Sequence, residues 1–221
     1  MLRVLTLPRK MCILYKMIID FTVNKETYTE YCLHCHQAAG FSEELVDGKK
    51  VFLCAACHSK NARKLIIDPK LHWWLDDEGR YCHESVGSVL INPKGEVLFF
   101  ELTKPPYGLT FPAGHVDIDE TPLQAVIRET EEEVGINIEN SNPKYIGGAM
   151  IAGDSCRRGS DDHKWSLYVT RVSDADAHKV SLDAHEGTQA RWVPIANIDQ
   201  SELAPAIKYL FEKYGIAIEE A

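Results

Sequence analysis

Three glutamates that could act together lie within five consecutive positions: Glu129, Glu132 and Glu133. In a helix, with about 100° between successive residues, their carboxylates project from one side and come close together. Negative charges at this spacing repel each other unless a cation lies among them. The cluster therefore indicates either a cation-binding site or an ordinary solvated acidic face, and the EEE run alone favours the solvated face.

The surrounding residues predict the helix that must carry these glutamates. Thr121 is a suitable N-cap, Pro122 suits the first helical position, and Gln124 at N3 completes a capping box. Gly135 can adopt the left-handed conformation that ends a helix. Four residues recur at spacings of three or four and are expected to form the buried face, away from the glutamates: Leu123, Ile127, Thr130 and Val134.

The stretch 114–136, GHVDIDETPLQAVIRETEEEVGI, resembles the Nudix box along its whole length. Gly114, Glu120 and the segment 128–136 keep the spacing of that box, with every charged residue and glycine in place. Thr130 stands where the family usually has an aliphatic residue, which concerns packing rather than chemistry. A match with this many fixed positions is a specific signal. The resemblance implies an enzyme, a Nudix pyrophosphohydrolase that needs a divalent metal.

The resemblance also implies roles for individual residues. The three glutamates would be catalytic ligands of Mg²⁺ or Mn²⁺, which screens phosphate oxygens and lowers the pKa of bound water. Arg128 and Glu120 would hold the carboxylates in place. Gly114 would let the loop pass close to the metal and the substrate, and the carbonyl of Ala113 matches a position that often binds a metal. Which glutamate acts as general base differs among family members.

Further binding residues are expected from loops outside the box. Glu186 best matches an additional acidic metal ligand in order and context; Asp161 and Asp162 are alternatives. An ordinary exposed glutamate is an equally good interpretation of Glu186. Arg157 and Arg158 lie in an irregular polar loop, where they could contact phosphates or be plain surface charges.

A second chemical pattern consists of two Cys-x-x-Cys pairs separated by a spacer of 18 residues. Each pair can present two thiolates to one ion from a tight turn, so together they suit a tetrahedral four-sulfur site. The pattern resembles a zinc ribbon, and a shell closed by four cysteines implies a structural Zn²⁺ rather than a catalytic one. Two disulfides, or unrelated core cysteines, are the alternative. The four residues are Cys32, Cys35, Cys54 and Cys57.

Composition sets limits on the class of protein. The 221 residues are 45 % hydrophobic and 26 % charged, which is ordinary for a soluble globular protein. The formal net charge of -9 gives no general nucleic-acid footprint, and no apolar run is long enough to span a membrane. The paired cysteines indicate metal and a reducing, cytoplasmic location. Cys82 and Cys156 have no partner spacing and are expected to be buried as small apolar residues. A homodimer is left open.

The chain divides into four segments by pattern. We expect an N-terminal arm at 1–27 that could be disordered, a zinc ribbon at 28–67, a linker at 68–84 and a Nudix hydrolase domain at 85–221. Trp73 and Trp74 are expected to pack where the ribbon meets the main domain. Apolar runs separated by turns from Val86 onwards, with a helix after the third strand and a last helix over 201–214, fit the α/β class and the Nudix α/β/α sandwich with a mixed sheet.

A zinc ribbon ahead of a Nudix domain is similar to the arrangement of NADH pyrophosphatases. The SQPWPFP run that those proteins carry after the box is missing here, where the residues after Ile136 read NIENSNPKYIGGAM. The expected substrate is therefore a nucleoside diphosphate derivative, such as NADH, ADP-ribose or a related nucleotide. A Nudix-fold sensor that binds a nucleotide without hydrolysing it and a zinc-ribbon adaptor are the rival hypotheses.

Overall fold

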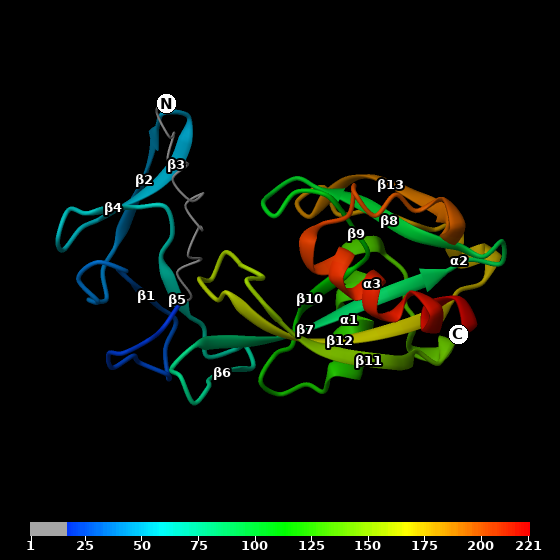
Figure 1. Ribbon diagram of the computed structural model, residues 1–221, viewed down its shortest axis with the longest axis horizontal. Helices are drawn as coiled ribbons and strands as arrows, with labels where there is room; N and C mark the ends of the chain where they lie inside the picture. Colours follow the sequence, from blue (N-terminus) through cyan, green and yellow to red (C-terminus); the bar gives the residue numbers. More distant parts are fainter. Residues whose placement is uncertain (1–16) are drawn as a thin grey trace, which may run out of the picture.

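The computed structural model describes residues 17–221, which form a small all-β module followed by a larger α/β domain (Figure 1). Residues 1–16, the larger part of the expected N-terminal arm, lie outside the described residues. The remainder of that arm packs where the two parts meet: Ile19 is buried in one cluster with Tyr81, and the backbone amide of Met17 donates to Asp161. Within residues 17–221 no helix is long and apolar enough to cross a membrane.

Two small sheets build the N-terminal module. β1 (Thr29–Tyr31) pairs with β5 (Leu65–Ile67), while β2 (Phe41–Val46), β3 (Lys49–Cys54) and β4 (Lys60–Asn61) form an antiparallel sheet. The expected turn lies between β2 and β3, where Asp47 and Gly48 adopt left-handed backbone with φ of 50° and 74°. One cysteine pair follows β1 and the other begins at the end of β3, so both pairs lie in turns.

The main sheet is mixed, as the sequence predicts. Its strand order is β11-β12-β7-β8-β13; β12 and β7 are parallel and the other neighbours are antiparallel. Three short strands extend it, β6 and β10 beside β7, and β9 beside β8. The strands are β6 (Trp73–Leu75), β7 (Tyr81–Ile91), β8 (Glu96–Leu102), β9 (Leu109–Thr110), β10 (Ala113–His115), β11 (Lys144–Ala152), β12 (Asp162–Arg171) and β13 (Gly187–Pro194).

Residues 68–84, expected to be a linker, contribute β6 and the start of the fully buried central strand β7. Several of the charges that suggested a linker lie in the tight turn between these strands, where Asp76 and Arg80 form an ion pair. Trp73 packs with Tyr81 in the cluster that joins module and domain, as predicted. Trp74 instead lies beside His72, with ring centroids 5.8 Å apart.

Helices cover both faces of the main sheet, which confirms the α/β/α sandwich (Figure 1). α1 (Pro122–Val134) packs on one face, and α3 (Pro205–Glu220) covers the other, where Leu210 and Phe211 meet Phe99 and Leu167. α3 starts later than the expected 201–214 because Pro205 occupies its first turn, and it runs further. Three single-turn helices complete the domain: η1 (Glu139–Ser141), α2 (Asp174–Ala177) and η2 (Ile195–Asn197).

The ends of α1 are the predicted ones. The Thr121 hydroxyl accepts a hydrogen bond from the Gln124 amide at 3.3 Å, and the Gln124 side chain accepts one from the Thr121 amide at 2.9 Å. Gly135 ends the helix in the left-handed conformation, with φ of 70°. These contacts fix where the helix begins and ends, and therefore where its glutamates lie.

The rotation of α1 about its axis differs from the expectation. Leu123 is 41 % exposed, whereas Ala125 and Val126 are buried. The helix is turned towards its glutamates, so Glu133, expected to lie away from the buried face, is only 8 % exposed. Thr130 is fully buried, and its hydroxyl donates to the carbonyl of Val126, which satisfies the polar group at this aliphatic position.

The capping box predicts a measurable effect of its N-cap. Thr121→Ala should lower the free energy of unfolding by about 1 kcal/mol, because one helix amide loses its acceptor. Thr121→Ser keeps that acceptor and should stay close to the wild-type value. Urea unfolding followed by circular dichroism compares the two variants. Equal losses for alanine and serine would show that the hydroxyl does not stabilise the helix.

Candidate active site

A guanidinium group lies at the centre of the carboxylates. Arg128 donates to both oxygens of Glu120, to Glu129 Oε1 at 2.8 Å and to Glu132 Oε2 at 3.1 Å. It also donates to the backbone carbonyl of His115 at 3.0 Å, which ties the helix to β10. The structure thus brings Glu120, Glu129 and Glu132 of the predicted catalytic cluster together around one cation.

Two of the glutamates are held out of water. Burial raises the pKa of Glu129 to about 7, although the neighbouring Arg128 acts to lower it. Burial also raises the pKa of Glu133 well above its usual value, against the hydrogen bond that its Oε2 accepts from the Ala113 amide at 2.9 Å. Glu132 differs from both because its side chain is 60 % exposed. One arginine leaves this wall of the site with excess negative charge.

Gly114 has a steric role that the sequence does not reveal. A β-carbon at this position would lie 2.0 Å from Cδ of Glu129, far inside van der Waals contact. The Glu129 carboxylate therefore occupies the space against β10 that a side chain at position 114 would need. Ala113 and Gly114 are held there by pairing of β10 with Gly87 and Val86 of β7.

The glutamates line a cavity of about 680 Å³, large enough for a nucleotide. Glu186, from the loop before β13, lines the same cavity, and its charge adds to the raised pKa of Glu133. The alternative Asp161 is committed elsewhere, because it pairs with Arg63 of the module. Asp162 is buried as the first residue of β12 and is outside the cavity lining.

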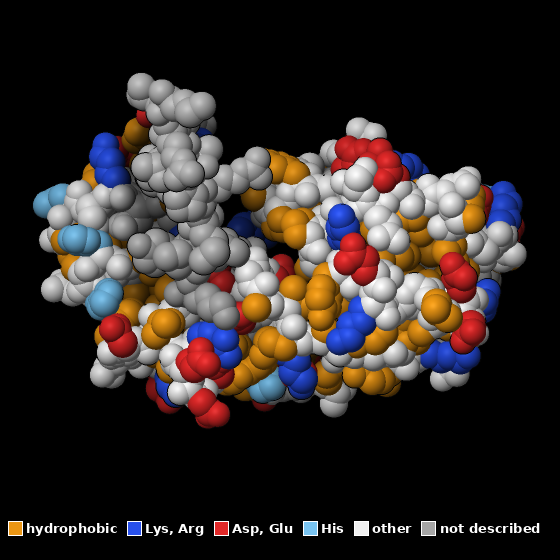
Figure 2. Space-filling view, viewed as in Figure 1, with side chains coloured by type: hydrophobic (Ala, Val, Ile, Leu, Met, Phe, Trp, Pro, Cys, Tyr) orange, Lys and Arg blue, Asp and Glu red, His pale blue; other side chains and the backbone are white. Residues whose placement is uncertain are grey.

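Arg157 and Arg158 belong to the same cavity. They come from the loop between β11 and β12, which contributes positive charge to a cavity whose α1 side is acidic. Arg157 is exposed, and Arg158 Nε lies 3.5 Å from Asp68 Oδ2. On the face shown in Figure 2, acidic and basic side chains are otherwise interspersed, without an extended basic surface.

The four cysteines of the module could hold a metal ion. Their sulfur atoms all lie within 4.8 Å of one another, and the Sγ atoms of Cys32 and Cys57 are 3.7 Å apart. Sulfurs bound tetrahedrally to zinc at 2.3 Å would be about 3.8 Å apart. All four are free thiols, so the two-disulfide alternative is not realised. Although burial opposes ionisation, hydrogen bonds from Ser59 and from backbone amides lower the pKa of Cys32 to about 6.

A second group of metal-binding residue types was not predicted from the sequence. One nitrogen or sulfur from each member lies within 4.8 Å of those of the other three. Cys156, expected to be a buried apolar residue, belongs to this group and lines the cavity. The three histidines are far apart in sequence, and the pairing of β7 with β12 and β10 brings them together, while the cysteine comes from the loop before β12. The group consists of His83, His115, Cys156 and His163.

Comparison with known proteins identifies the main domain. A family model described as NUDIX domain matches residues 82–214. An RNA pyrophosphohydrolase of Pseudoalteromonas translucida is 31 % identical over 129 residues, which cover 54 % of this chain and 73 % of that protein. A putative 8-oxo-dGTP diphosphatase 3 of Mycobacterium tuberculosis is 31 % identical over 106 residues, covering 48 % of this chain and 46 % of that protein. The chain thus spans less than half of the length of this second relative.

Among solved structures, an Ap4A hydrolase of C. elegans matches with a TM-score of 0.49 and 22 % identity, over 63 % of this chain and 99 % of that one. The NUDIX model covers more than half of the chain, including α1 with its glutamates and the five long strands of the main sheet. The chain therefore belongs to the NUDIX domain family.

Proposed function

We propose that this protein is a metal-dependent hydrolase that cleaves the diphosphate linkage of a nucleoside diphosphate derivative through attack of water on phosphorus. One observation carries the proposal: at the wall of a nucleotide-sized cavity Glu133 is buried and the Glu129 side chain is only 14 % exposed, with Arg128 as the neighbouring cation. Folding keeps two carboxylates out of water at considerable cost, which a bound cation would offset.

The donor set fits a hard divalent cation. Mg²⁺ and Mn²⁺ prefer oxygen ligands, and the α1 side of the cavity offers carboxylates without sulfur or nitrogen ligands among them. We assign the metal-binding role to the side chains of Glu129, Glu132, Glu133 and Glu186 and to the carbonyl of Ala113. A metal bound there would screen phosphate oxygens and lower the pKa of a bound water.

The remaining residues position the reactants. Arg128 and Glu120 hold the glutamates through the hydrogen bonds described above and act as positioning residues. We assign phosphate binding to Arg157 and Arg158, because guanidinium groups match phosphate oxygens in charge and geometry. Gly114 admits the Glu129 carboxylate and the substrate to the same narrow space. The substrate class includes NADH and ADP-ribose, and the names of the relatives add 8-oxo-dGTP and RNA to the candidates.

We propose further that the module, residues 28–67, is a zinc ribbon whose ion is structural. The distance between the Sγ atoms of Cys32 and Cys57 is close to that of two sulfurs bound tetrahedrally to one zinc ion, which supports this proposal. The small apolar core of the module supports it as well, because such a core alone stabilises a fold poorly. The module also contacts the loop that carries the two arginines: the Ile66 amide donates to the Arg158 carbonyl at 2.9 Å. A folded ribbon would therefore brace one wall of the cavity.

Hydrolysis of a nucleotide panel with Mg²⁺ tests the function. The panel contains NADH, ADP-ribose, diadenosine polyphosphates, 8-oxo-dGTP and 5′-triphosphate RNA, and products are separated by chromatography. We expect cleavage between two phosphorus atoms of at least one member. Binding of a member without turnover would favour the nucleotide sensor, and neither binding nor turnover would favour the adaptor.

Charge removal within α1 separates the metal ligands from their neighbours. Glu133→Gln and Glu132→Gln should each lower turnover by roughly two orders of magnitude or more, since each removes a charge that holds the metal. Glu131→Gln is the matched control, because Glu131 is exposed on the same helix and bonds Asn137 outside the cavity. Near wild-type rates for the first two variants at saturating Mg²⁺ would refute these ligand assignments.

The raised pKa of Glu129 predicts how metal binding depends on pH. In the metal-free protein this carboxyl holds a proton below about pH 7, and a metal must displace it. Lowering the pH should therefore weaken Mn²⁺ binding. The dissociation constant should rise by about tenfold from pH 8 to pH 6 for this proton alone. Calorimetric titration of zinc-loaded protein measures the change. Glu129→Gln should weaken binding and flatten its pH dependence, while Glu131→Gln should retain both. Equal affinity of the wild type at both pH values would contradict the assignment.

The same raised pKa has a consequence for the metal-free fold. The pKa of Glu129 is higher in the folded state than in the unfolded state. Its carboxyl group therefore contributes to the free energy of unfolding fully below the unfolded-state pKa, and this contribution is lost as pH rises through about 7. Added Mn²⁺ should accordingly raise the melting temperature more at pH 8 than at pH 6.

Loss of the ribbon's zinc should act through structure. Cys32→Ser should remove one zinc per chain and lower the melting temperature, and Trp73 emission should shift as its contacts with the module are lost. Cys82→Ala, which changes a buried cysteine outside the module, is the control. EDTA followed by excess Mg²⁺ should restore activity wherever the ribbon keeps its ion. An unchanged zinc content and melting temperature in Cys32→Ser would contradict the ribbon.

A further inference from the structure

We propose that His83, His115, Cys156 and His163 form a second transition-metal site, separate from the four cysteines and from the α1 glutamates. Their ligand atoms all lie within 4.8 Å of one another. The set of three imidazoles and one thiolate suits Zn²⁺ or a similar borderline ion, whereas Mg²⁺ prefers oxygen. The cavity would then be bordered by two metal sites of different chemistry.

The separations between the ligand atoms match a tetrahedral shell. His115 Nε2 and His163 Nε2 are 3.3 Å apart, and Cys156 Sγ is 3.6 Å from His83 Nδ1. Tetrahedral zinc with bonds of 2.0–2.1 Å to nitrogen and 2.3 Å to sulfur separates two nitrogens by about 3.3–3.4 Å and a nitrogen from a sulfur by about 3.6 Å. Both observed distances agree with one ion between the four atoms.

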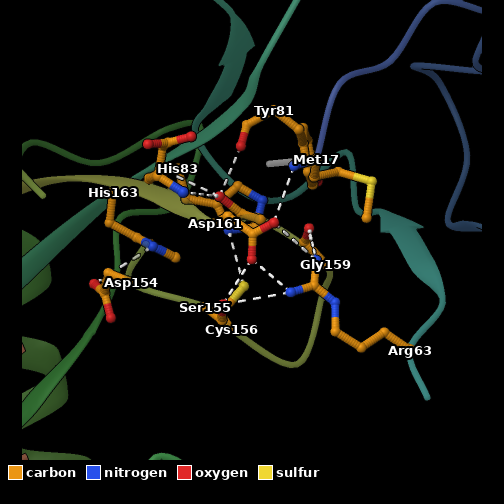
Figure 3. Close-up of polar contacts among 12 residues, drawn as sticks. Met17, Arg63, Tyr81, His83, Asp154, Ser155, Cys156, Gly159, Asp161 and His163 are labelled. Atoms are coloured by element: carbon orange, nitrogen blue, oxygen red, sulfur yellow. Dashed lines mark hydrogen bonds and ion pairs between the residues drawn. The ribbon is translucent and has the colours of Figure 1, made fainter. Parts of the chain in front are cut away.

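The fold places the four residues on one side of the sheet. β12 runs parallel to β7 with His163 directly opposite His83, and β10 pairs His115 with Ser85, two residues further along β7. Side chains two residues apart on a strand share a face. Cys156 approaches from a tight turn of the β11–β12 loop, closed by a hydrogen bond from its amide to the Ser160 carbonyl at 2.9 Å. Figure 3 shows Cys156 converging with His83 and His163.

The ring nitrogens of the proposed shell are shielded from water and face one another. His83 is fully buried and His163 is 2 % exposed; His83 Nδ1 faces Cys156 Sγ, and His163 Nε2 faces His115 Nε2. Polar atoms gathered out of water lose their hydration, and a shared ion would offset that cost. Burial also holds the pKa of His83 and of His115 low, which keeps both imidazoles in the neutral form that binds metal.

A carboxylate lies behind one of the proposed ligands. Asp154 Oδ2 is 3.5 Å from His163 Nδ1 (Figure 3). A hydrogen bond from Trp165 Nε1 at 2.8 Å fixes the same oxygen. Carboxylates commonly orient metal-binding histidines in this way, through the ring nitrogen that faces away from the ion. A thiolate–imidazolium pair of Cys156 and His163 would be the rival arrangement, but it gives no role to His83 and His115.

Four protein ligands would close the shell, so the ion would be structural and would fasten the β11–β12 loop to the sheet. Arg157 and Arg158 directly follow Cys156 in that loop, and the backbone carbonyl of His115 accepts a hydrogen bond from Arg128. The ion would thus set the arginine wall of the cavity relative to the glutamate wall. This consequence rests on the proposed function, whereas the metal site itself does not.

Metal analysis of the full chain, purified without chelators, tests the site independently of turnover. We expect two zinc ions per chain in the wild type and one in Cys156→Ala and in His163→Ala. The matched controls Cys82→Ala and His178→Ala change a buried cysteine and an exposed histidine outside the group and should keep two. Equal zinc contents in the wild type and in Cys156→Ala would overturn the proposal.

Cobalt substitution provides a second measurement should an alanine variant fail to fold. In the Cys32→Ser/Cys35→Ser background, Co²⁺ should give the visible bands of a tetrahedral site together with thiolate-to-cobalt charge transfer. Cys156→His in that background should keep the tetrahedral bands and lose only the charge transfer, because a fourth imidazole replaces the sulfur. Absence of tetrahedral Co²⁺ bands in the folded Cys32→Ser/Cys35→Ser chain would refute the site.

Discussion

The structure of the site depends on the burial of two carboxylates on α1. Glu129 lies in the space left by the missing side chain of Gly114, and Glu133 is held by the Ala113 amide. Arg128 offsets part of the charge through Glu129 and Glu120, but one guanidinium cannot neutralise four carboxylates. The remaining carboxyl groups must either hold protons, as the raised pKa values of Glu129 and Glu133 indicate, or bind further cations. We propose that this imbalance makes the wall a metal site. The same carboxyl groups would then affect the stability of the fold, its dependence on pH and the rate of hydrolysis.

The opposite wall of the cavity depends on contacts between parts distant in sequence. The β11–β12 loop is held by the N-terminal module, because Arg63 pairs with Asp161 and also donates to the Gly159 carbonyl at 3.0 Å (Figure 3). The Met17 amide reaches Asp161 at 2.9 Å, and Ser160 donates to the Tyr81 carbonyl at 2.8 Å. The module therefore positions the loop that carries Arg157 and Arg158, and in this way it would affect the reaction indirectly.

Features encoded by local spacing could be predicted from the sequence, and features that arise from packing could not. The caps of α1 and the two cysteine pairs each occupy a few neighbouring residues, so their geometry follows from the local backbone. The rotation of α1 depends on what the sheet offers, and a pattern of apolar spacings placed Leu123 inside although it is exposed. His83 and His163 lie 80 residues apart and meet only through the register of two parallel strands.

We propose that Glu129 and Glu133 of α1 bind the metal that hydrolysis needs. Anomalous diffraction from a crystal grown with Mn²⁺ and a non-hydrolysable ADP-ribose analogue would locate that metal. We expect a manganese peak within bonding distance of carboxylate oxygens of Glu129 and Glu133, about 2.1–2.3 Å for a hard divalent ion. Manganese bound only at other positions, with those two carboxylates still unligated, would contradict it.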